Sequence, residues 1–117
     1  MIKEKENIIT KYGVNEGYLV ICDHSSNNIP SEYNNLGVSK KDLESHRAYD
    51  LGASDVAYEL SKLLECSLVM ANFSRLLIDP NRGKDDPTLI PKLSEGKIIK
   101  GNMNISIHKN DKEKNKR

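Results

Sequence analysis

The sequence predicts an α/β fold with a mainly parallel sheet, built on a strand–helix–strand unit. Two apolar runs of strand length, residues 17–22 and 66–73, flank a longer segment with helical periodicity, residues 39–65. Both runs are continuously apolar rather than alternating, which is typical of parallel strands covered on both faces. We therefore expect a three-layer arrangement in which helices cover both sides of the sheet.

The helical segment begins with a recognisable cap. Ser39 and Asp42 have the spacing of a capping box, in which each side chain satisfies a backbone N–H of the first turn. Gly52 interrupts the segment at a cost of about 1 kcal/mol relative to alanine, so it marks a kink, a close backbone contact or a break between two shorter helices. A third apolar run, residues 76–78, follows the second strand, and we interpret it as part of a neighbouring strand.

Length and charge limit the classes of protein that fit. The chain has 117 residues, enough for one domain. Its 18 Lys and Arg nearly balance its 17 Asp and Glu, so nucleic acid and anionic membrane surfaces are not expected partners. The sequence lacks a membrane-length apolar run and the apolar centre of a signal peptide. We expect a cytoplasmic protein with one domain over residues 1–104 and a polar, disordered tail over 105–117.

A polar cluster, residues 23–28, directly follows the first predicted strand. Ligand sites in open α/β sheets lie beyond the carboxyl ends of the strands, so the cluster has the expected position of a site. His24, beside Asp23, suits a metal ligand or a general base, and a turn histidine bonded to backbone is the structural alternative. His46 and Asp50 would project from one face of the predicted helix, as a site pair or as an exposed ion pair.

Five motifs appear in register along the chain. They are "CDHSSNNIP" (22–30), "LGVSKKDLESHRAYDLGA" (36–53), "FSRLLIDPNR" (73–82), "PTLIPKLSEG" (87–96) and "IKGN" (99–102). Together they make the chain similar to the N-terminal part of the N-formylglutamate amidohydrolase family over residues 18–104. The resemblance implies an α/β fold similar to the zinc-dependent exopeptidases. It also implies hydrolysis of N-formyl-L-glutamate to formate and L-glutamate in histidine degradation.

The matched motifs carry the residues that we expect to form the site. The expected catalytic residues are His24, Asp23 and Asp50. The expected substrate-binding residues are Asn27, Arg75, Asn81 and Arg82. A divalent metal such as zinc would be held by His24 and His46. His24 and Asn27 also stand where the exopeptidases have an HxxE zinc pair, and asparagine is a much poorer zinc ligand than glutamate.

Arginines around the third apolar run suit an acidic substrate. A small acidic N-acyl amino acid offers planar carboxylates, which guanidinium groups bind through two parallel hydrogen bonds. Arg75 and Arg82 flank Asp79 and Asn81, so an internal ion pair with Asp79 is the structural alternative. We expect Arg82 and Asn81 to lie near the substrate and Arg75 to hold the more structural position.

The resemblance covers only the N-terminal part of the family, which leaves two hypotheses. In the first, the chain is an amidohydrolase, active alone or after pairing with a separate C-terminal half, in which a polarised water attacks the formyl carbon. In the second, it is a non-catalytic fragment or binding module from a split or decayed gene. In both, the incomplete sheet would have an open edge, which also invites self-association.

Overall fold

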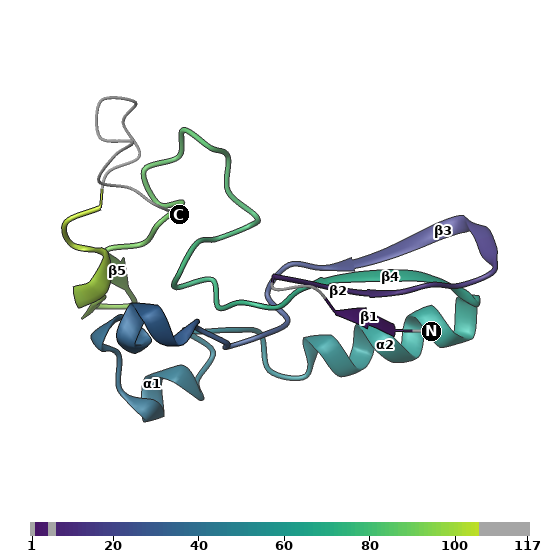
Figure 1. Cartoon of the computed structure of the whole chain (residues 1–117), viewed down its shortest axis with the longest axis horizontal. Coiled ribbons are helices and arrows are strands. Elements are labelled where there is room, and N and C mark those ends of the chain that lie inside the picture. Colours follow the sequence, from purple (N-terminus) through teal and green to yellow (C-terminus); the bar gives the residue numbers. More distant parts are fainter. Residues whose placement is uncertain (1, 5–6, 106–117) are drawn as a thin grey trace.

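A computed structural model of the chain describes residues 2–4 and 7–105 (Figure 1). A sheet with one helix packed against it forms one end of the molecule, and short helices and loops form the other. The elements in chain order are β1 (Ile2–Glu4), β2 (Ile8–Lys11), β3 (Asn15–Cys22), the 3₁₀ helix η1 (Ser31–Gly37), α1 (Lys40–Leu43), α2 (Ala53–Leu64), β4 (Cys66–Ala71), β5 (Leu93–Ser94), β6 (Lys97–Ile98) and the 3₁₀ helix η2 (Lys100–Asn102).

The predicted strand–helix–strand unit is present as β3, α2 and β4. The two strands are parallel neighbours, with Val20 opposite Leu68 and Ile21 opposite Val69, and α2 packs on both of them. Leu68 is buried at this contact. The α/β class predicted from the sequence is therefore confirmed.

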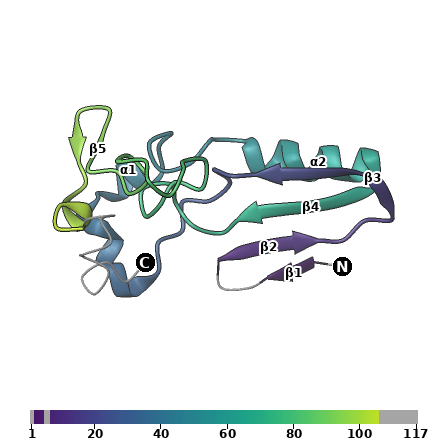
Figure 2. The ribbon, with the colours of Figure 1, turned by 90° about the horizontal axis from the view of Figure 1, so that it is seen from above.

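The sheet is mixed, and the prediction of a mainly parallel sheet is wrong. Its strand order is β1-β2-β4-β3, in which β2 pairs antiparallel with both β1 and β4 (Figure 2). Strands β1 and β2 were not predicted from the sequence, because the apolar residues of positions 1–11 form only two pairs, at 1–2 and 8–9. Within the described residues, α2 is the helix that packs on this sheet, so the part of the fold seen here has two layers rather than three.

Residues 39–65 form two helices rather than one. The backbone N–H of Asp42 donates to Ser39 Oγ at 3.2 Å, as the predicted cap requires, but α1 ends at Leu43. Gly52 has a φ of 80° and immediately precedes α2, so it marks the break between two helices. His46 and Asp50 consequently lie in the connecting turn, and their predicted placement on one helix face is wrong.

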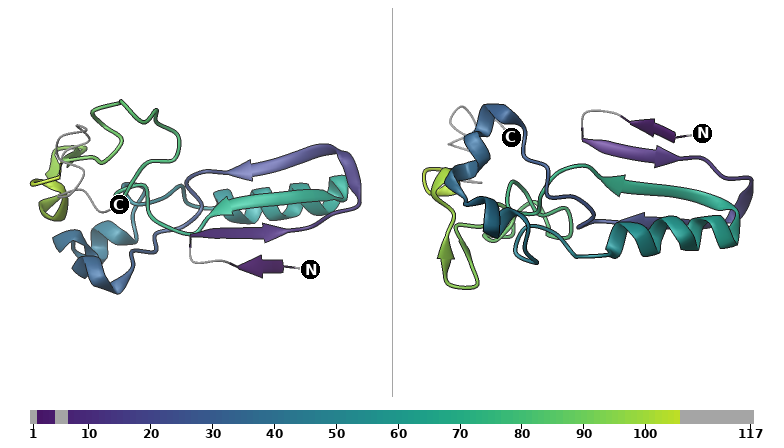
Figure 3. Two further views of the ribbon diagram at one scale, coloured as in Figure 1. Left: turned by 45° about the horizontal axis from the view of Figure 1, so that its top comes forward. Right: turned by 90° about the horizontal axis from the view of Figure 1, so that it is seen from below.

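The third apolar run is not a strand. Residues 75–77 form a turn, and Leu76 and Leu77 are buried in the core of the loop-rich end. That core consists of Ile29, Leu36, Ala48, Leu76, Leu77 and Ile99. The run is apolar because Leu76 and Leu77 fill this core. Figure 3 shows the loop-rich end, which lies beyond one end of the sheet.

The position of β3 also differs from the expectation. The predicted burial of this strand on both faces is wrong, because β3 is an edge strand and the side chains of Leu19 and Ile21 are 62% and 63% exposed.

In the described part of the chain, no helix has both the length and the apolar character needed to cross a membrane. The predicted tail lies outside the described residues from position 106 onward.

Candidate functional site

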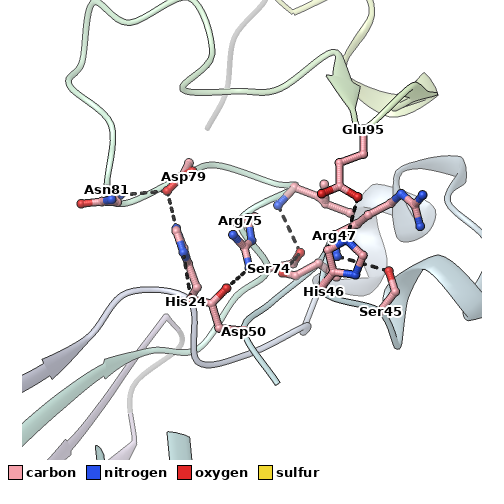
Figure 4. A network of polar contacts seen from close by, with 12 residues as sticks. His24, Ser45, His46, Arg47, Asp50, Ser74, Arg75, Asp79, Asn81 and Glu95 are labelled. Carbon is pink, nitrogen blue, oxygen red and sulfur yellow. Dashed lines mark hydrogen bonds and ion pairs between the residues drawn. The ribbon is translucent and has the colours of Figure 1, made fainter. Parts of the chain in front are cut away.

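A polar hollow of about 390 Å³ opens beyond the carboxyl ends of β3 and β4. The residues singled out from the sequence that line it are His24, His46, Asp50, Arg75, Asn81 and Arg82. Figure 4 shows most of these side chains in one network of polar contacts. These side chains therefore lie together at the strand ends, where the sequence predicted a site.

Backbone hydrogen bonds hold the loop between α1 and α2 against the ends of the strands. The N–H of Asp50 donates to the carbonyl oxygen of His24 at 2.9 Å, which fixes these two residues side by side. Ser74, just after β4, donates its hydroxyl to the carbonyl oxygen of Ala48 at 2.8 Å. Because Ser74 and Ala48 are both fully buried, this contact anchors the loop rigidly beneath the hollow.

Asn102 fixes the opposite wall. It is fully buried, and its side-chain amide donates to the carbonyl oxygens of Leu76 and Pro91, each at 2.7 Å. Leu76 and Pro91 both line the hollow. The "IKGN" motif thus contributes a residue that shapes the site without facing it.

His24 is held by a buried carboxylate. Its Nε2 lies 2.6 Å from Asp79 Oδ1, and its Nδ1 lies 3.5 Å from Asp50 Oδ2. Burial alone would raise the pKa of Asp79, but hydrogen bonds from His24 and from the N–H of Asn81, together with the nearby positive charge of Arg82, lower it below its ordinary value. An ionised Asp79 only accepts hydrogen bonds, so the proton of a neutral His24 ring sits on Nε2 and the Nδ1 lone pair points toward Asp50.

One of the two arginines, Arg82, forms the ion pair with Asp79 that was predicted as the structural alternative. Arg82 Nε lies 3.5 Å from Asp79 Oδ2, whereas Arg75 forms its ion pair with Asp50 rather than with Asp79. Arg47, which the sequence analysis did not single out, also lines the hollow. Within the described residues, the Nε atoms of Arg47 and Arg75 are buried and have no hydrogen-bond acceptor. Buried donors are normally paired, so these two Nε–H groups are exceptions among the described residues.

His46 has a different carboxylate partner from His24. Its Nε2 lies 2.6 Å from Glu95 Oε2, and both side chains are more than half exposed. The hydrogen bond from His46 lowers the pKa of Glu95. Figure 4 shows Arg75 between the two histidines, so the structure does not present them as a joined pair.

Two of the expected site residues do not line the hollow. Asn27 donates its side-chain amide to the carbonyl oxygen of Leu43 at 2.8 Å, which ties the loop after β3 to the end of α1. Asp23 is adjacent to His24 in sequence but is absent from the described lining. Burial raises the pKa of the neighbouring Cys22 thiol, and the negative charges of Asp50 and Asp23 raise it further.

Sequence reasoning missed the site roles of Arg47, Asp79 and Glu95. Arg47 and Asp79 stand inside the quoted motifs "SHRAYD" and "LLIDPNR", so their membership of those motifs was an available signal. Glu95 stands inside the quoted motif "PTLIPKLSEG", so the same signal was available for it, although its partner His46 is 49 positions away.

Comparisons with known proteins agree with the motifs. The family model described as N-formylglutamate amidohydrolase matches residues 17–117. The crystal structure of gene product Atu2144 from Agrobacterium tumefaciens is similar, with a TM-score of 0.80 and 37% sequence identity over a match covering 86% of this chain. This chain spans 40% of the length of that protein. A search of curated proteins finds no match. Because the family model matches most of its length, the chain belongs to the N-formylglutamate amidohydrolase family.

Proposed function

We propose that this chain supplies part of the active site of an amidohydrolase that cleaves the formyl amide of N-formyl-L-glutamate, or of a similar small acidic N-acyl amino acid. The products are formate and L-glutamate. Family membership supports the reaction class. The observation that carries the proposal is His24, held by Asp79 at 2.6 Å in a hollow that several arginines line.

His24 is the general base of this proposal. With its Nε2–H donating to Asp79, its Nδ1 takes a proton from water as the water oxygen bonds to the formyl carbon. The same proton then passes to the amide nitrogen as the C–N bond breaks, which releases formate and the free amine of glutamate. Asp50, with Oδ2 at 3.5 Å from Nδ1, stabilises the positive ring between these two transfers.

The arginines are the carboxylate ligands of this proposal. N-formyl-L-glutamate carries two carboxylates, and a hollow containing Arg47, Arg75 and Arg82 offers guanidinium donors for both. Arg82 is half exposed at the rim, where Asn81 adds an amide.

A divalent metal such as zinc is a separate proposal, and the described residues do not form a complete site for it. His24 Nδ1 and Asp50 Oδ2 are two suitable donors, but Arg75 already pairs with the other oxygen of Asp50. His46 pairs with Glu95. Catalytic zinc usually has three protein ligands, and the described residues contain no group of three or more that could hold a metal. We therefore assign no step of the reaction to a metal.

The test is formate release by a chimera in which this chain replaces the matched segment of the Agrobacterium protein. N-formyl-L-glutamate is the substrate, and N-formyl-L-glutamine, which has nearly the same shape and one carboxylate fewer, is the control compound. We expect the chimera to prefer the glutamate compound by about 10-fold or more, since a charge-assisted bond would be lost. We expect His24→Ala to lower kcat/KM by about 100-fold or more. The chain alone should release little or no formate.

Matched variants separate binding from catalysis. Arg82→Gln should reduce the preference for the glutamate compound, whereas Lys41→Gln, which removes a positive charge on α1 outside the hollow, should leave both activities unchanged. Undiminished formate release in the His24→Ala chimera would contradict the base role. Saturable binding of N-formyl-L-glutamate by a folded chimera that releases no formate would favour the non-catalytic binding module.

A further inference from the structure

The turn of the β5–β6 hairpin carries a glutamate that turn chemistry does not explain. The two strands pair up to Ser94 and Lys97, which leaves Glu95 and Gly96 as a two-residue turn. Both residues have positive φ angles, 46° and 81°, as in a type I′ turn. Asparagine, aspartate or glycine usually takes the first of these positions, because other residues are uncommon at positive φ. The explanation for Glu95 therefore lies in its side chain.

The side chain of Glu95 lies among basic groups that line the hollow. His46 Nε2 is 2.6 Å from Glu95 Oε2, and Figure 4 shows the glutamate pointing from the hairpin toward this histidine. The hydrogen bond from His46 is the main cause that lowers the pKa of Glu95, and the positive charges of Arg47 and Arg75 lower it further, although desolvation opposes them. Glu95 is therefore an ionised carboxylate at neutral pH, surrounded by basic side chains from the loops that follow α1 and β4.

Arg47 and Arg75 also contact carboxylates that belong to the frame of the site. Arg75 pairs with Asp50, and Arg47 Nη1 lies 3.5 Å from Asp42 Oδ1. A guanidinium group has five N–H donors, so one carboxylate partner does not use all the donors of either arginine. Each arginine can therefore donate to a second carboxylate, and the Glu95 carboxylate already lies within the electrostatic influence of both.

The contact between Glu95 and His46 is easily opened. Both side chains are more than half exposed, and an exposed ion pair contributes little to stability. β5 and β6 have two residues each, and a two-stranded hairpin is marginally stable by itself. The base of the hairpin is fixed, because the N–H of the buried Ile99 donates to the carbonyl oxygen of Lys92 at 2.9 Å. Glu95 can therefore leave the hollow while the base of the hairpin stays in place.

We propose that His46, Arg47 and Arg75 form a carboxylate subsite that Glu95 occupies in this structure, and that one carboxylate of an acidic ligand displaces Glu95 from it. The class of ligand comes from the proposed function, on which this inference rests. The protein thereby supplies a competitor for its own ligand, and an acidic compound binds only to the molecules whose Glu95 has withdrawn. Loss of the Glu95 charge should therefore strengthen the binding of such a compound.

The test measures the binding of glutarate, a dicarboxylate that lacks an amide bond, so the result does not depend on hydrolysis. NMR titration of the full chain gives Kd at pH 7 and about 0.15 M salt, where distant charges are screened. Glu95→Gln should lower Kd by about 3-fold or more, because an exposed pair competes only weakly. Arg47→Gln should raise Kd by about 3-fold or more, because it removes a guanidinium donor. Glu59→Gln, which breaks a similar exposed pair with Lys62 on α2, is the matched control and should leave Kd unchanged.

The location of the spectral changes is the second measurement. In the wild type, glutarate should shift the amide signals of His46 and of residues 94–97, because the ligand takes one partner and releases the other. The proposal would be overturned by a Kd that Glu95→Gln does not lower or that Glu59→Gln lowers equally, and also by a lack of glutarate binding in Glu95→Gln. Formate release by the chimera together with an unchanged Kd would overturn this proposal alone. A lower Kd in Glu95→Gln beside a chimera that releases no formate would support the subsite and contradict only the reaction.

Discussion

Replacing Asp79 by asparagine tests whether this carboxylate is the group that holds the site together. The side chain is 9% exposed and accepts hydrogen bonds from His24 at 2.6 Å and from the N–H of Asn81 at 2.9 Å, with Arg82 Nε at 3.5 Å. Asparagine keeps the shape but removes the charge. A hydrogen bond to a charged group is worth about 1.5–3 kcal/mol and a neutral one about 1 kcal/mol, so two weakened bonds amount to about 2 kcal/mol. For a domain of this size, Tm should fall by about 8 °C.

The pH dependence of stability tests whether the charge of Asp79 causes the stability difference between the wild type and Asp79→Asn. The folded-state pKa of Asp79 is lowered, so its stabilisation is fully present above the unfolded value and is lost as the pH falls through the lower, folded value. The stability gap between the wild type and Asp79→Asn should therefore be present at pH 7 and should narrow below the ordinary aspartate value of 3.8.

Urea unfolding at pH 7, 5 and 3, followed by circular dichroism, measures this gap. Asp85→Asn, which removes an exposed carboxylate from the loop after Arg82, is the matched control and should change the unfolding free energy by less than about 0.5 kcal/mol. Equal stability of the wild type and Asp79→Asn at pH 7 would refute the argument. A gap that persists unchanged at pH 3 would show that it does not arise from the charge.

Two further variants test the packing around the site and the start of β3. Asn102→Asp replaces the amide that donates to two buried carbonyls with a group that repels them, and should cost about 2–4 kcal/mol in urea unfolding at pH 7; wild-type stability in this variant would show that these bonds are dispensable. Gly13→Ala would place a Cβ 2.2 Å from the carbonyl carbon of Cys66, so we expect a loss of about 1–3 kcal/mol in the same measurement. Gly83→Ala, where a Cβ meets nothing within 4 Å, is its control and should be at least as stable as the wild type.

The local parts of the fold could be predicted from the sequence. The β3–α2–β4 unit depends on the hydrophobic periodicity and the composition of each segment, and both can be recognised in the sequence. The pairing of β2 with β4 could not be predicted, because it joins Ile8 to Ala71 across most of the chain and β2 is only four residues long. The apolar run at residues 76–78 was misread because a short apolar run fits a strand and a loop core equally well.

In the candidate site, too, local features could be predicted from the sequence and long-range contacts could not. His24 was predictable because it directly follows a strand, at the position where α/β sheets place their ligands. Its partner Asp79 is 55 positions away, so no local spacing could identify the contact between them. The ion pair expected between Asp79 and an arginine is present with Arg82, whereas Arg75 lies beside Asp50 because the turn before α2 brings that carboxylate to the strand ends.

The misjudged burial of β3 has a physical cause in its sequence. Unbroken apolar runs are typical of strands that are covered on both faces, and residues 18–22 form such a run. The structure leaves one edge and one face of that strand open, while the polar site at its end is already held by buried contacts through Ser74 and Asn102. The site residues are thus held by contacts within the described part of the chain, although the strand that precedes His24 has one free edge and exposed side chains.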